Sequence, residues 1–303
     1  MKILLLGCDG QVGWELQRSL QPLGEVVALD FQSAHLAADF SRPAALAATV
    51  DAVKPGLIVN AAAHTAVDKA ESEPDLAQAI NADAAGVLAR SAAAAGAWLV
   101  HYSTDYVFDG SGDQPRDEQA ATGPLSVYGR TKLDGERQIR ESGCRHLILR
   151  TSWVYAARGG NFARTMLRLA ATKTELNVID DQIGAPTGAD LLADLTALMA
   201  RAAHARPELA GTYHAVAAGA TSWHGYARLD IEAARARCVP LALPADALRP
   251  IPTSAYPTPA PRPLNSRLGT RKLRECFGVH LPDWDTGVRR LLAEILPTQG
   301  IPQ

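Results

Sequence analysis

The stretch KILLLGCDGQVGWEL, residues 2–16, decides the fold, because it runs from an apolar segment through a glycine array into a helical pattern. Residues 2–6 are typical of a short buried strand, and the GxxGxxG array opens a helix predicted over 11–24. Glycine permits a tight turn and a close approach of the backbone to a pyrophosphate, while a helix N-terminus offers free N–H groups. The pattern predicts a dinucleotide cradle. Its residues are Gly7, Gly10, Gln11, Val12 and Gly13.

The same alternation of strand and helix continues through the first 150 residues. Apolar runs typical of buried strands occur at 25–30, 57–60, 98–103 and 146–150. Helices are predicted between them, at 43–56, roughly 75–95 and around Tyr128. Short strands separated by such helices form βαβ units, with a parallel sheet covered on both faces. The sequence therefore predicts a doubly wound, Rossmann-like α/β fold.

The pattern loosens after residue 150. One strand is predicted at 175–179, and helices are predicted near 161–171, 188–204, 222–236, 269–276 and 284–296. The proline-rich stretch at 250–263 has too few backbone donors for a helix or a central strand, so an ordered loop packed against a ligand or lid is predicted. We expect a dinucleotide-binding Rossmann domain over 1–155. A smaller C-terminal α/β region over 156–303 is expected to be mainly substrate-binding and partly interleaved with the Rossmann core.

The composition limits the partners and the compartment. Charged residues make up 20% of the 303 residues and the net charge is −2, so the basic excess of a nucleic-acid binder or of a protein held on acidic membranes is lacking. The four cysteines form no CxxC pair, which argues against a disulfide framework or a zinc site and fits a reducing cytosol. The apolar N-terminal run is too short for a signal peptide or a membrane span. A cytoplasmic chain with no nucleic-acid and no membrane partner is expected.

Asp30 is the predicted ribose-binding acid. It ends the second predicted strand, 17 residues after Gly13, where a carboxylate accepts hydrogen bonds from the adenosine ribose hydroxyls. An acid at this place usually repels the 2′-phosphate of NADP, and no basic residue follows it immediately, although Arg42 could come near. The choice between NADPH and NADH therefore stays open. Asp9, inside the phosphate loop, is expected to point away from the pyrophosphate.

A hydroxyl, a phenol and an ammonium are predicted to meet at the carboxyl edge of the sheet. Thr104 follows the strand at 98–103, and Tyr128 and Lys132 lie four residues apart on the next helix, so they share one face. These groups suit carbonyl reduction. Thr104 would hydrogen-bond the substrate carbonyl oxygen, and Tyr128 would protonate it as hydride reaches the carbon. The Lys132 ammonium would favour the phenolate and could hold the nicotinamide ribose.

Motifs along nearly the whole chain carry a family resemblance. They are GCDGQVGWEL, NAAAHTAVDKAE, STDYVFDG, YGRTK, RTSWVYA, DQIGAPT and RPLNSRL. With them the chain resembles the dTDP-4-dehydrorhamnose reductases, which are extended short-chain dehydrogenase/reductases; generic short-chain dehydrogenases lack the last two motifs. The resemblance implies that NADPH or NADH reduces the 4-keto group of a dTDP-4-keto-6-deoxy-sugar, dTDP-4-dehydro-β-L-rhamnose. This is the last step in making dTDP-L-rhamnose for surface polysaccharide.

The resemblance also implies roles for single residues. Tyr128 would be the proton donor, and Lys132 would bind the cofactor. Other residues that would line the cofactor are Asp39, Phe40, Ala63, His64 and Thr65. Residues that would contact the sugar nucleotide are Thr104, Asp105 and Trp153. Judged by itself, Trp153 could equally be a core aromatic, and His64 a partly buried structural histidine.

Some members of this family dimerise around a magnesium ion held by acidic side chains. Glu15, Asp190 and Glu294 are the acids that would form such a Mg2+ site in a homodimer. Exposed helix carboxylates are the alternative reading of these residues. A metal between subunits would serve assembly rather than hydride transfer.

Two other functions stay open at this point. An NDP-sugar 4,6-dehydratase or 4-epimerase of the same superfamily would share the fold, but dehydratases follow the STD motif with a glutamate, where this chain has Tyr106. A non-catalytic regulatory subunit similar to the methionine adenosyltransferase beta subunit is the second alternative. The intact Thr104, Tyr128 and Lys132 argue against it.

Overall fold

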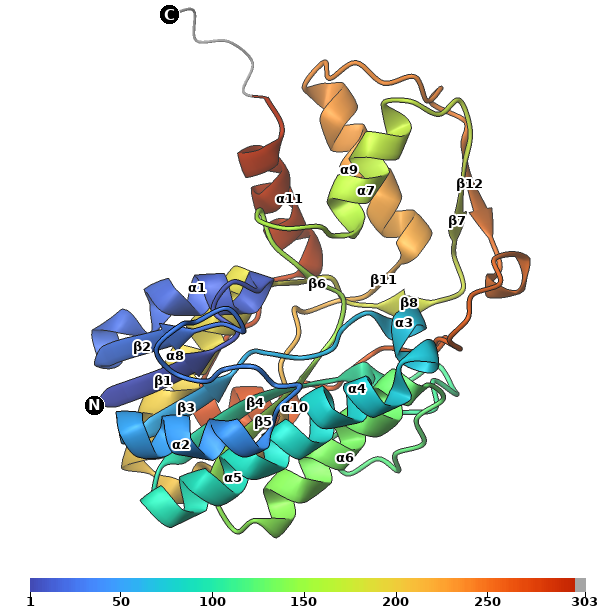
Figure 1. Cartoon of the computed structure of the whole chain (residues 1–303). Coiled ribbons are helices and arrows are strands. Elements are labelled where there is room, and N and C mark those ends of the chain that lie inside the picture. Colours follow the sequence, from blue (N-terminus) through green and yellow to red (C-terminus); the bar gives the residue numbers. More distant parts are fainter. Residues whose placement is uncertain (298–303) are drawn as a thin grey trace, which may run out of the picture.

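The computed structural model describes residues 1–297, and a six-stranded parallel sheet forms its centre (Figure 1). The order across the sheet is β10-β5-β4-β3-β1-β2, so the chain moves from β1 to β2 on one side and then crosses to β3 on the other. This confirms the predicted doubly wound α/β fold. The strands are β1 (Lys2–Leu6), β2 (Glu25–Leu29), β3 (Leu57–Asn60), β4 (Trp98–Thr104), β5 (Arg145–Thr151) and β10 (Gly211–His214).

The strands carry nearly continuous apolar runs because both faces of the sheet are buried. In β1, Ile3 and Leu5 join a hydrophobic cluster on one face, and Leu4 and Leu6 join a cluster on the other. Each cluster is closed by helices. The helices on the first face are α1 (Gln11–Ser19), α8 (Ala189–Ala205) and α10 (Arg271–Phe277). Those on the second face are α2 (Ala44–Val53), α5 (Ala84–Ala95) and α6 (Val127–Glu141).

A second lobe stands at the upper right of Figure 1. Its core surrounds Tyr155, Tyr226 and Leu292. The helices that supply this lobe are α7 (Phe162–Ala170), α9 (Trp223–Ala236) and α11 (Trp284–Ile295), and at its outer side β7 (Leu176–Ile179) pairs in parallel with β12 (Leu248–Ile251).

Short elements connect these parts. They are the helices α3 (Val67–Ser72) and α4 (Pro74–Gln78), the π-helical turn η2 (Ala79–Asp83), the strands β6 (Val154–Tyr155), β8 (Ile183–Gly184), β9 (Thr187–Gly188) and β11 (Thr221–Ser222), and the 3-10 turns η1 (Gln21–Leu23), η3 (Asp105–Val107), η4 (Pro207–Leu209) and η5 (Thr253–Ala255).

The structure contains strands that the sequence pattern does not predict, among them β10 and β12, and it confirms the strand predicted at 175–179. The pattern does not predict β10, yet β10 pairs with β5 at the edge of the main sheet. The predicted strand at 175–179 lies in the second lobe as β7, and its partner β12 contains Pro250, which an edge strand accepts because one of its sides needs no donor. Strand β10 and helices α8 and α10 belong to the main sheet and the helix layer that covers it. The second half of the chain therefore supplies part of the first lobe. The functional division at residue 155 stays a prediction.

The proline-rich segment is ordered, as predicted, and is tied to the first lobe. The Arg262 guanidinium donates to both carboxylate oxygens of Asp68, at 3.0 and 2.7 Å, and Ala260 N donates to one of them at 3.1 Å. Contact of this segment with a ligand stays a prediction.

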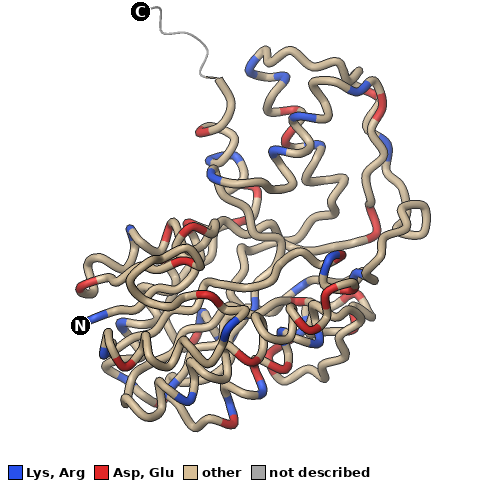
Figure 2. The backbone as a smooth tube through the Cα atoms, in the orientation of Figure 1, with Lys and Arg blue, Asp and Glu red and all other residues tan. Residues whose placement is uncertain are grey.

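Charged residues of both signs are interspersed along the backbone (Figure 2), in keeping with the net charge of −2. No helix within residues 1–297 is both long and apolar enough to cross a membrane.

Candidate active site

A cavity of about 430 Å³ opens at the carboxyl edge of the sheet, where the connections after β1 and β3 diverge. In open α/β sheets this switch point is the usual place for a ligand. A hollow of about 630 Å³ under the loop 111–120 is formed by that loop alone and carries none of the predicted residues. Predicted residues that line the cavity at the switch point are Gly10, Gln11, Val12, Ala63, Thr65, Thr104, Asp105, Tyr128, Lys132 and Trp153.

The glycine loop has the shape of a phosphate cradle. Gly7 has φ +82°, a Cβ there would lie 2.7 Å from Ala62 N, and a Cβ at Gly13 would collide with Gly7 O. Both positions therefore need glycine. Gly10 faces the cavity, and the only atom near an added Cβ would be Gly7 O at 3.3 Å. Helix α1 has no side-chain cap and no acid in its first turn, so its N–H groups remain for a pyrophosphate. These residues fit the dinucleotide that the sequence predicts.

Asp30 lies directly after β2, as the ribose role requires. Its Oδ1 accepts hydrogen bonds from Gln32 N at 3.0 Å and Ser33 Oγ at 2.9 Å. Asp9 turns towards Asp30, and the hydrogen bond between the two carboxyl groups raises the pKa of Asp9 and lowers that of Asp30. Two acids therefore stand together where the adenosine ribose would lie.

Asp39 and Phe40 do not line the cavity. Asp39 closes the turn before α2, where its Oδ1 accepts from Ser41 N at 2.9 Å and from Ser41 Oγ at 2.7 Å. Phe40 is buried in the hydrophobic cluster that also holds Leu46. Their cofactor roles stay predictions.

Hydrogen bonds with the Asn81 side chain fix the segment Ala63 to Thr65. His64 N donates to Asn81 Oδ1 at 2.8 Å, and Asn81 Nδ2 donates to His64 O at 3.2 Å and to Thr131 Oγ1 at 3.1 Å. Asn81 lies in the π-helical turn η2, a distortion that is frequent near functional sites. Sequence reasoning missed this residue, although an asparagine inside an alanine-rich helix is a signal for it.

Thr104 and Asp105 stand at the end of β4, and both are buried. Thr104 Oγ1 donates to Asp105 Oδ1 at 3.1 Å and accepts from Tyr106 N at 3.2 Å. Burial raises the pKa of Asp105 to about 6, although hydrogen bonds with Ser266 and Thr104 oppose the shift. Asp105 Oδ2 has no hydrogen-bond partner among the described residues. An unpaired buried oxygen at a cavity wall suits a ligand hydroxyl.

Tyr128 is the second residue of α6, which begins after the capping residue Ser126. Its ring meets Tyr106 edge to face, with the ring centroids 5.4 Å apart. Burial raises the pKa of Tyr128 to about 12, while a hydrogen bond with Thr104 opposes this. The shift is opposite to the one expected from a neighbouring ammonium, and it keeps Tyr128 a phenol at neutral pH.

Lys132 is buried one helical turn further on. Its Nζ donates to Tyr102 O at 2.5 Å and lies 3.2 Å from His101 Nε2. Burial lowers the pKa of Lys132 to about 8, against the opposing effect of the Glu136 charge. His101 lies on β4 and in turn faces Asn60 at the end of β3. Sequence reasoning missed both of these residues.

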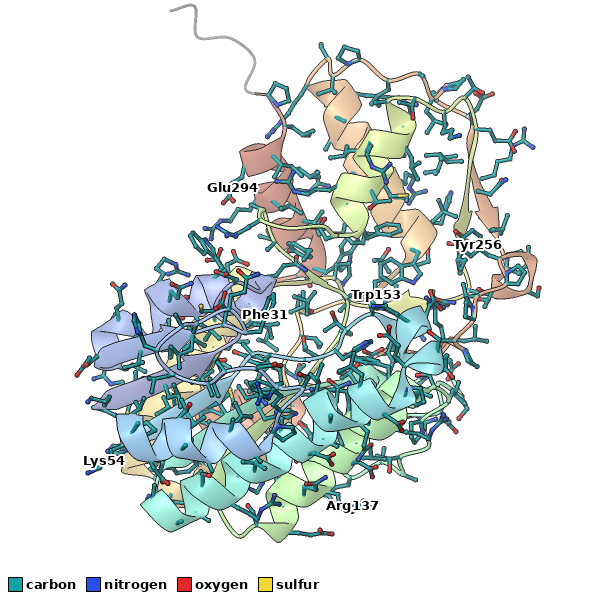
Figure 3. All side chains as sticks on the ribbon, viewed as in Figure 1. Phe31, Lys54, Arg137, Trp153, Tyr256 and Glu294 are labelled. Carbon is teal, nitrogen blue, oxygen red and sulfur yellow. The ribbon has the colours of Figure 1, made fainter. Side chains whose placement is uncertain are left out.

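Trp153 lies at the junction of the two lobes (Figure 3) and lines the cavity. Its ring stacks on Trp223 of α9, with the ring centroids 3.6 Å apart and the planes 13° apart. A Cβ at Gly184 would lie 2.8 Å from the indole. The φ of Trp153 is +49°, a conformation that costs a non-glycine residue about 1–2 kcal/mol. The stacked indole thus occupies a strained, well-defined position. Trp223 also lines the cavity and was not singled out from the sequence.

Glu15, Asp190 and Glu294 come together around a separate cavity of about 40 Å³. Arg290 lies 3.4 Å from both Asp190 Oδ2 and Glu294 Oε1, and Arg18 lies 3.7 Å from Glu15. Figure 3 shows Glu294 on α11, away from Trp153. Within residues 1–297, no group of three or more His, Cys, Asp or Glu is arranged to hold a metal ion. The acids of a single chain, paired with arginine, therefore do not fit a magnesium site.

Comparisons with known proteins cover both lobes. A family model described as RmlD substrate binding domain matches residues 1–296. The chain is 57% identical over 301 residues to the dTDP-4-dehydrorhamnose reductase of Escherichia coli (strain K12), covering 99% of this chain and 100% of that protein. It is 50% identical over 304 residues to the protein of the same name from Burkholderia thailandensis, covering 98% and 99%. The crystal structure of dTDP-4-dehydrorhamnose reductase from Bacillus anthracis in complex with NADP is similar, with a TM-score of 0.86, 32% identity and coverage of 97% and 99%.

Proposed function

This chain belongs to the dTDP-4-dehydrorhamnose reductase family, and we propose that it reduces the 4-keto group of dTDP-4-dehydro-β-L-rhamnose with NADPH or NADH to give dTDP-L-rhamnose. It is an NAD(P)H-dependent oxidoreductase. The observation that carries the proposal is that Thr104, Tyr128 and Lys132 line one cavity together with the glycine cradle.

The reaction adds a hydride and a proton across the C4 carbonyl group. The bound dihydronicotinamide supplies the hydride. As the new C–H bond forms, the π electrons of the carbonyl move to its oxygen, and Tyr128 gives that oxygen a proton. Tyr128 is left as a phenolate, which regains a proton from solvent. Thr104, whose hydroxyl donates to Asp105 Oδ1 in the ligand-free structure, would turn to donate to the same substrate oxygen.

The remaining residues bind and orient. The cradle holds the pyrophosphate, Asp30 the adenosine ribose and Lys132 the nicotinamide ribose. Asp105 would accept a hydrogen bond from a sugar hydroxyl, since its Oδ2 is otherwise unpaired. Trp153, which lines the cavity, would contact the sugar nucleotide.

Dehydration is the weaker alternative, because Tyr106 stands where dehydratases have a glutamate. The Tyr106 ring packs on Tyr128 and is mostly buried, and burial raises the pKa of its phenol above the usual value for tyrosine. A neutral phenol in this place is a poor base for removing a proton from C5 of a sugar.

For the cofactor, we expect NADH to be used at least as well as NADPH. The adjacent carboxyl groups of Asp9 and Asp30 would repel a 2′-phosphate. The positive charge of Arg158 acts on Asp9 and lowers its pKa. The Bacillus anthracis relative was solved with NADP, so both cofactors have to be compared.

The test is the loss of reduced-nicotinamide absorbance when the purified chain meets freshly generated dTDP-4-dehydro-β-L-rhamnose, with NADH and NADPH run in parallel. Many turnovers yielding dTDP-rhamnose support the reductase. Cofactor binding without turnover would point instead to the non-catalytic regulatory subunit or to a different keto-sugar substrate, and co-purification with a synthetase would support the regulatory subunit.

Assembly and location also stay proposals. A homodimer around magnesium predicts a mass in sedimentation velocity that doubles with Mg2+ and falls back with a chelator. A monomer under both conditions would end this proposal. A cytoplasmic location is expected, and cell fractionation tests it.

A further inference from the structure

The loop that joins β6 to α7 is fixed at both ends and presents an arginine between them. Asn161 caps α7 by accepting from Arg164 N at 3.1 Å, and its Nδ2 donates to Ala156 O at 2.6 Å. The intervening residues Arg158 to Gly160 are exposed. Hydrogen bonds across the base of the loop therefore set where Arg158 stands.

The tip of this loop lies against the first turns of α1, at the glycine cradle. A Cβ at Gly159 would lie 3.5 Å from Gln11 Cγ, and Gln11 lines the cavity at the switch point. The guanidinium carbon of Arg158 stands 3.9 Å from the centroid of the Trp14 ring. Trp14 is one helical turn from Gly10, to whose carbonyl oxygen its N–H donates at 2.8 Å. The arginine therefore stands beside the place where the dinucleotide phosphates would bind.

The Arg158 side chain is available to an anion. Arg158 and Trp14 are both exposed, so the stacked pair lies at the surface of the cradle. A guanidinium held by its flat face keeps its N–H groups free in its own plane. Within residues 1–297, Arg158 makes no hydrogen bond and no ion pair that would occupy them. An arginine fork in this state fits the oxygens of a phosphate group.

The charge of Arg158 also reaches the two acids at the adenosine ribose. Hydrogen bonding with Asp30 raises the pKa of Asp9, and the positive charge of Arg158 opposes this shift. No arginine or lysine stands between Asp30 and Arg42 in the sequence, and the charge of Arg42 acts on Asp39. A positive charge for the acid pair thus comes from the loop after β6.

We propose that Arg158 binds the 2′-phosphate of NADPH and so determines how well this chain accepts NADPH beside NADH. A 2′-phosphate next to Asp9 and Asp30 is repelled by both carboxylates, and an arginine beside them offsets that repulsion. NADH carries only a hydroxyl group at this position, so its binding does not need Arg158. The inference rests on the proposed use of a nicotinamide dinucleotide, and it does not depend on the identity of the keto-sugar.

Binding of the two cofactors to the full chain tests the assignment without any keto-sugar. In Arg158→Gln, calorimetric titration should show the dissociation constant of NADPH rising about tenfold and that of NADH staying within about twofold, because one charge-assisted phosphate contact is lost. Adenosine 2′,5′-bisphosphate, which carries the phosphate, and 5′-AMP, which lacks it, should show the same contrast. The loss for NADPH should shrink as sodium chloride is raised, since the contact is exposed.

The matched control is Arg18→Gln, which removes the same charge from the far end of α1, where Arg18 pairs with Asp194 at 2.9 Å. Neither dissociation constant should change by more than about twofold, because salt screens a charge at that distance. Equal weakening of NADPH and NADH in Arg158→Gln would place Arg158 on the pyrophosphate and overturn the proposal, as would unchanged binding of both. A wild type that binds neither cofactor would overturn the proposed function as well.

A second variant separates a direct contact with the phosphate from an effect of Arg158 on Asp9 alone. In Asp9→Asn the repulsion is smaller, so NADPH should bind more tightly than it does to the wild type. Because Arg158 contacts the phosphate itself, adding Arg158→Gln to this variant should still weaken NADPH binding about fivefold or more. A loss below about twofold in the double variant would show that Arg158 acts only through Asp9, and it would overturn the direct contact.

Discussion

At the scale of single residues, Tyr128 is the group on which the proposed reduction depends. Its phenol is buried and hydrogen-bonded by Thr104, so it remains protonated until the carbonyl oxygen takes its proton. Tyr128→Phe removes the proton and little else. We expect kcat to fall by about 10²–10⁴-fold, the usual range for one general acid, with the dissociation constant of the cofactor unchanged. Cofactor oxidation and calorimetric titration measure the two quantities.

The control for this variant is Tyr213→Phe. Tyr213 is equally a buried phenol, but its hydroxyl donates to Leu209 O at 2.8 Å, outside the cavity. Turnover in this variant should stay within about twofold of the wild type, because the change touches no group of the proposed chemistry. Wild-type turnover in Tyr128→Phe would remove the proton-donor role.

The Asp105 carboxylate is expected to destabilise the fold and to contribute to binding of the sugar nucleotide. Its pKa is raised to about 6 in the folded chain from a reference of 3.8. The unfolding free energy therefore falls between about pH 4 and about pH 6, so the cost is absent below about pH 4 and complete above about pH 6. Asp105→Asn removes the cost. Relative to the wild type, the variant should gain at most about 3 kcal/mol of unfolding free energy as the pH rises from about 4 to about 7. Urea unfolding at both pH values measures the gain.

The same variant should bind the sugar nucleotide less well. Losing a buried carboxylate acceptor costs a ligand hydrogen bond, and we expect KM for the sugar nucleotide to rise about tenfold, with the affinity for the cofactor unchanged. Asp113→Asn, in the exposed loop 111–120, is the control and should change neither quantity. Equal pH dependence of stability in wild type and Asp105→Asn would contradict the prediction.

The sequence identifies Thr104, Tyr128 and Lys132 because their cues are local: a strand end and a four-residue spacing on one helix. Asn60 and His101 escape it for a physical reason. They are 41 residues apart and meet only because β3 and β4 pair in parallel with Asn60 opposite His101. A single sequence does not contain that register.

At the scale of elements, α9 contains a carboxyl group with no partner. Asp230 is fully buried, and neither of its carboxyl oxygens has a hydrogen-bond partner within residues 1–297. Burial raises its pKa to about 8. The folded chain therefore keeps a proton that the unfolded chain loses near its ordinary pKa. The stability that this proton supplies is full at low pH and is lost as the pH rises through about 8.

The raised pKa of Asp230 predicts that the unfolding free energy falls with rising pH above the pKa of Asp105. Between about pH 6 and about pH 8, Asp230 should lower the unfolding free energy of the wild type by at most about 1.4 kcal/mol per pH unit. Asp230→Asn keeps the shape but cannot titrate, so its stability should be flatter over this window in urea unfolding. Asp194→Asn, on the exposed side of α8, should instead follow the wild type. An Asp230→Asn curve parallel to the wild type would show that Asp230 is not buried and neutral.

The elements that the sequence predicts well are those with a long periodic pattern, such as α8 and α9. Strand β10 has no such pattern, since its four residues are Gly-Thr-Tyr-His. It becomes a strand because the open edge of β5 supplies backbone partners from Leu147 to Arg150. Tertiary pairing, rather than local propensity, creates this element.

At the scale of the whole molecule, the cavity draws on both lobes. The glycine cradle, Thr104, Tyr128 and Lys132 come from the first, whereas Trp223 comes from the second and stacks on Trp153 at the junction. We therefore expect a nicotinamide cofactor to need mainly the first lobe and a sugar nucleotide to need both. The sequence anticipates two regions, but it does not reveal how much of the sheet layer comes from the second half of the chain.

The dependence of the first lobe on the second half of the chain can be tested with a fragment that ends at residue 155. The fragment 1–155 keeps the glycine loop and Tyr128, but it loses β10 and α8. Helix α8 supplies Leu192, Leu195 and Met199 to the cluster on one face of the sheet, so the fragment would expose that face and the edge of β5. We expect a fragment without fixed near-ultraviolet circular dichroism and without measurable NADH binding in calorimetry, whereas the full chain has both. A fragment that binds NADH with the affinity of the full chain would show instead that residues 1–155 form an independent domain, as the sequence alone predicts.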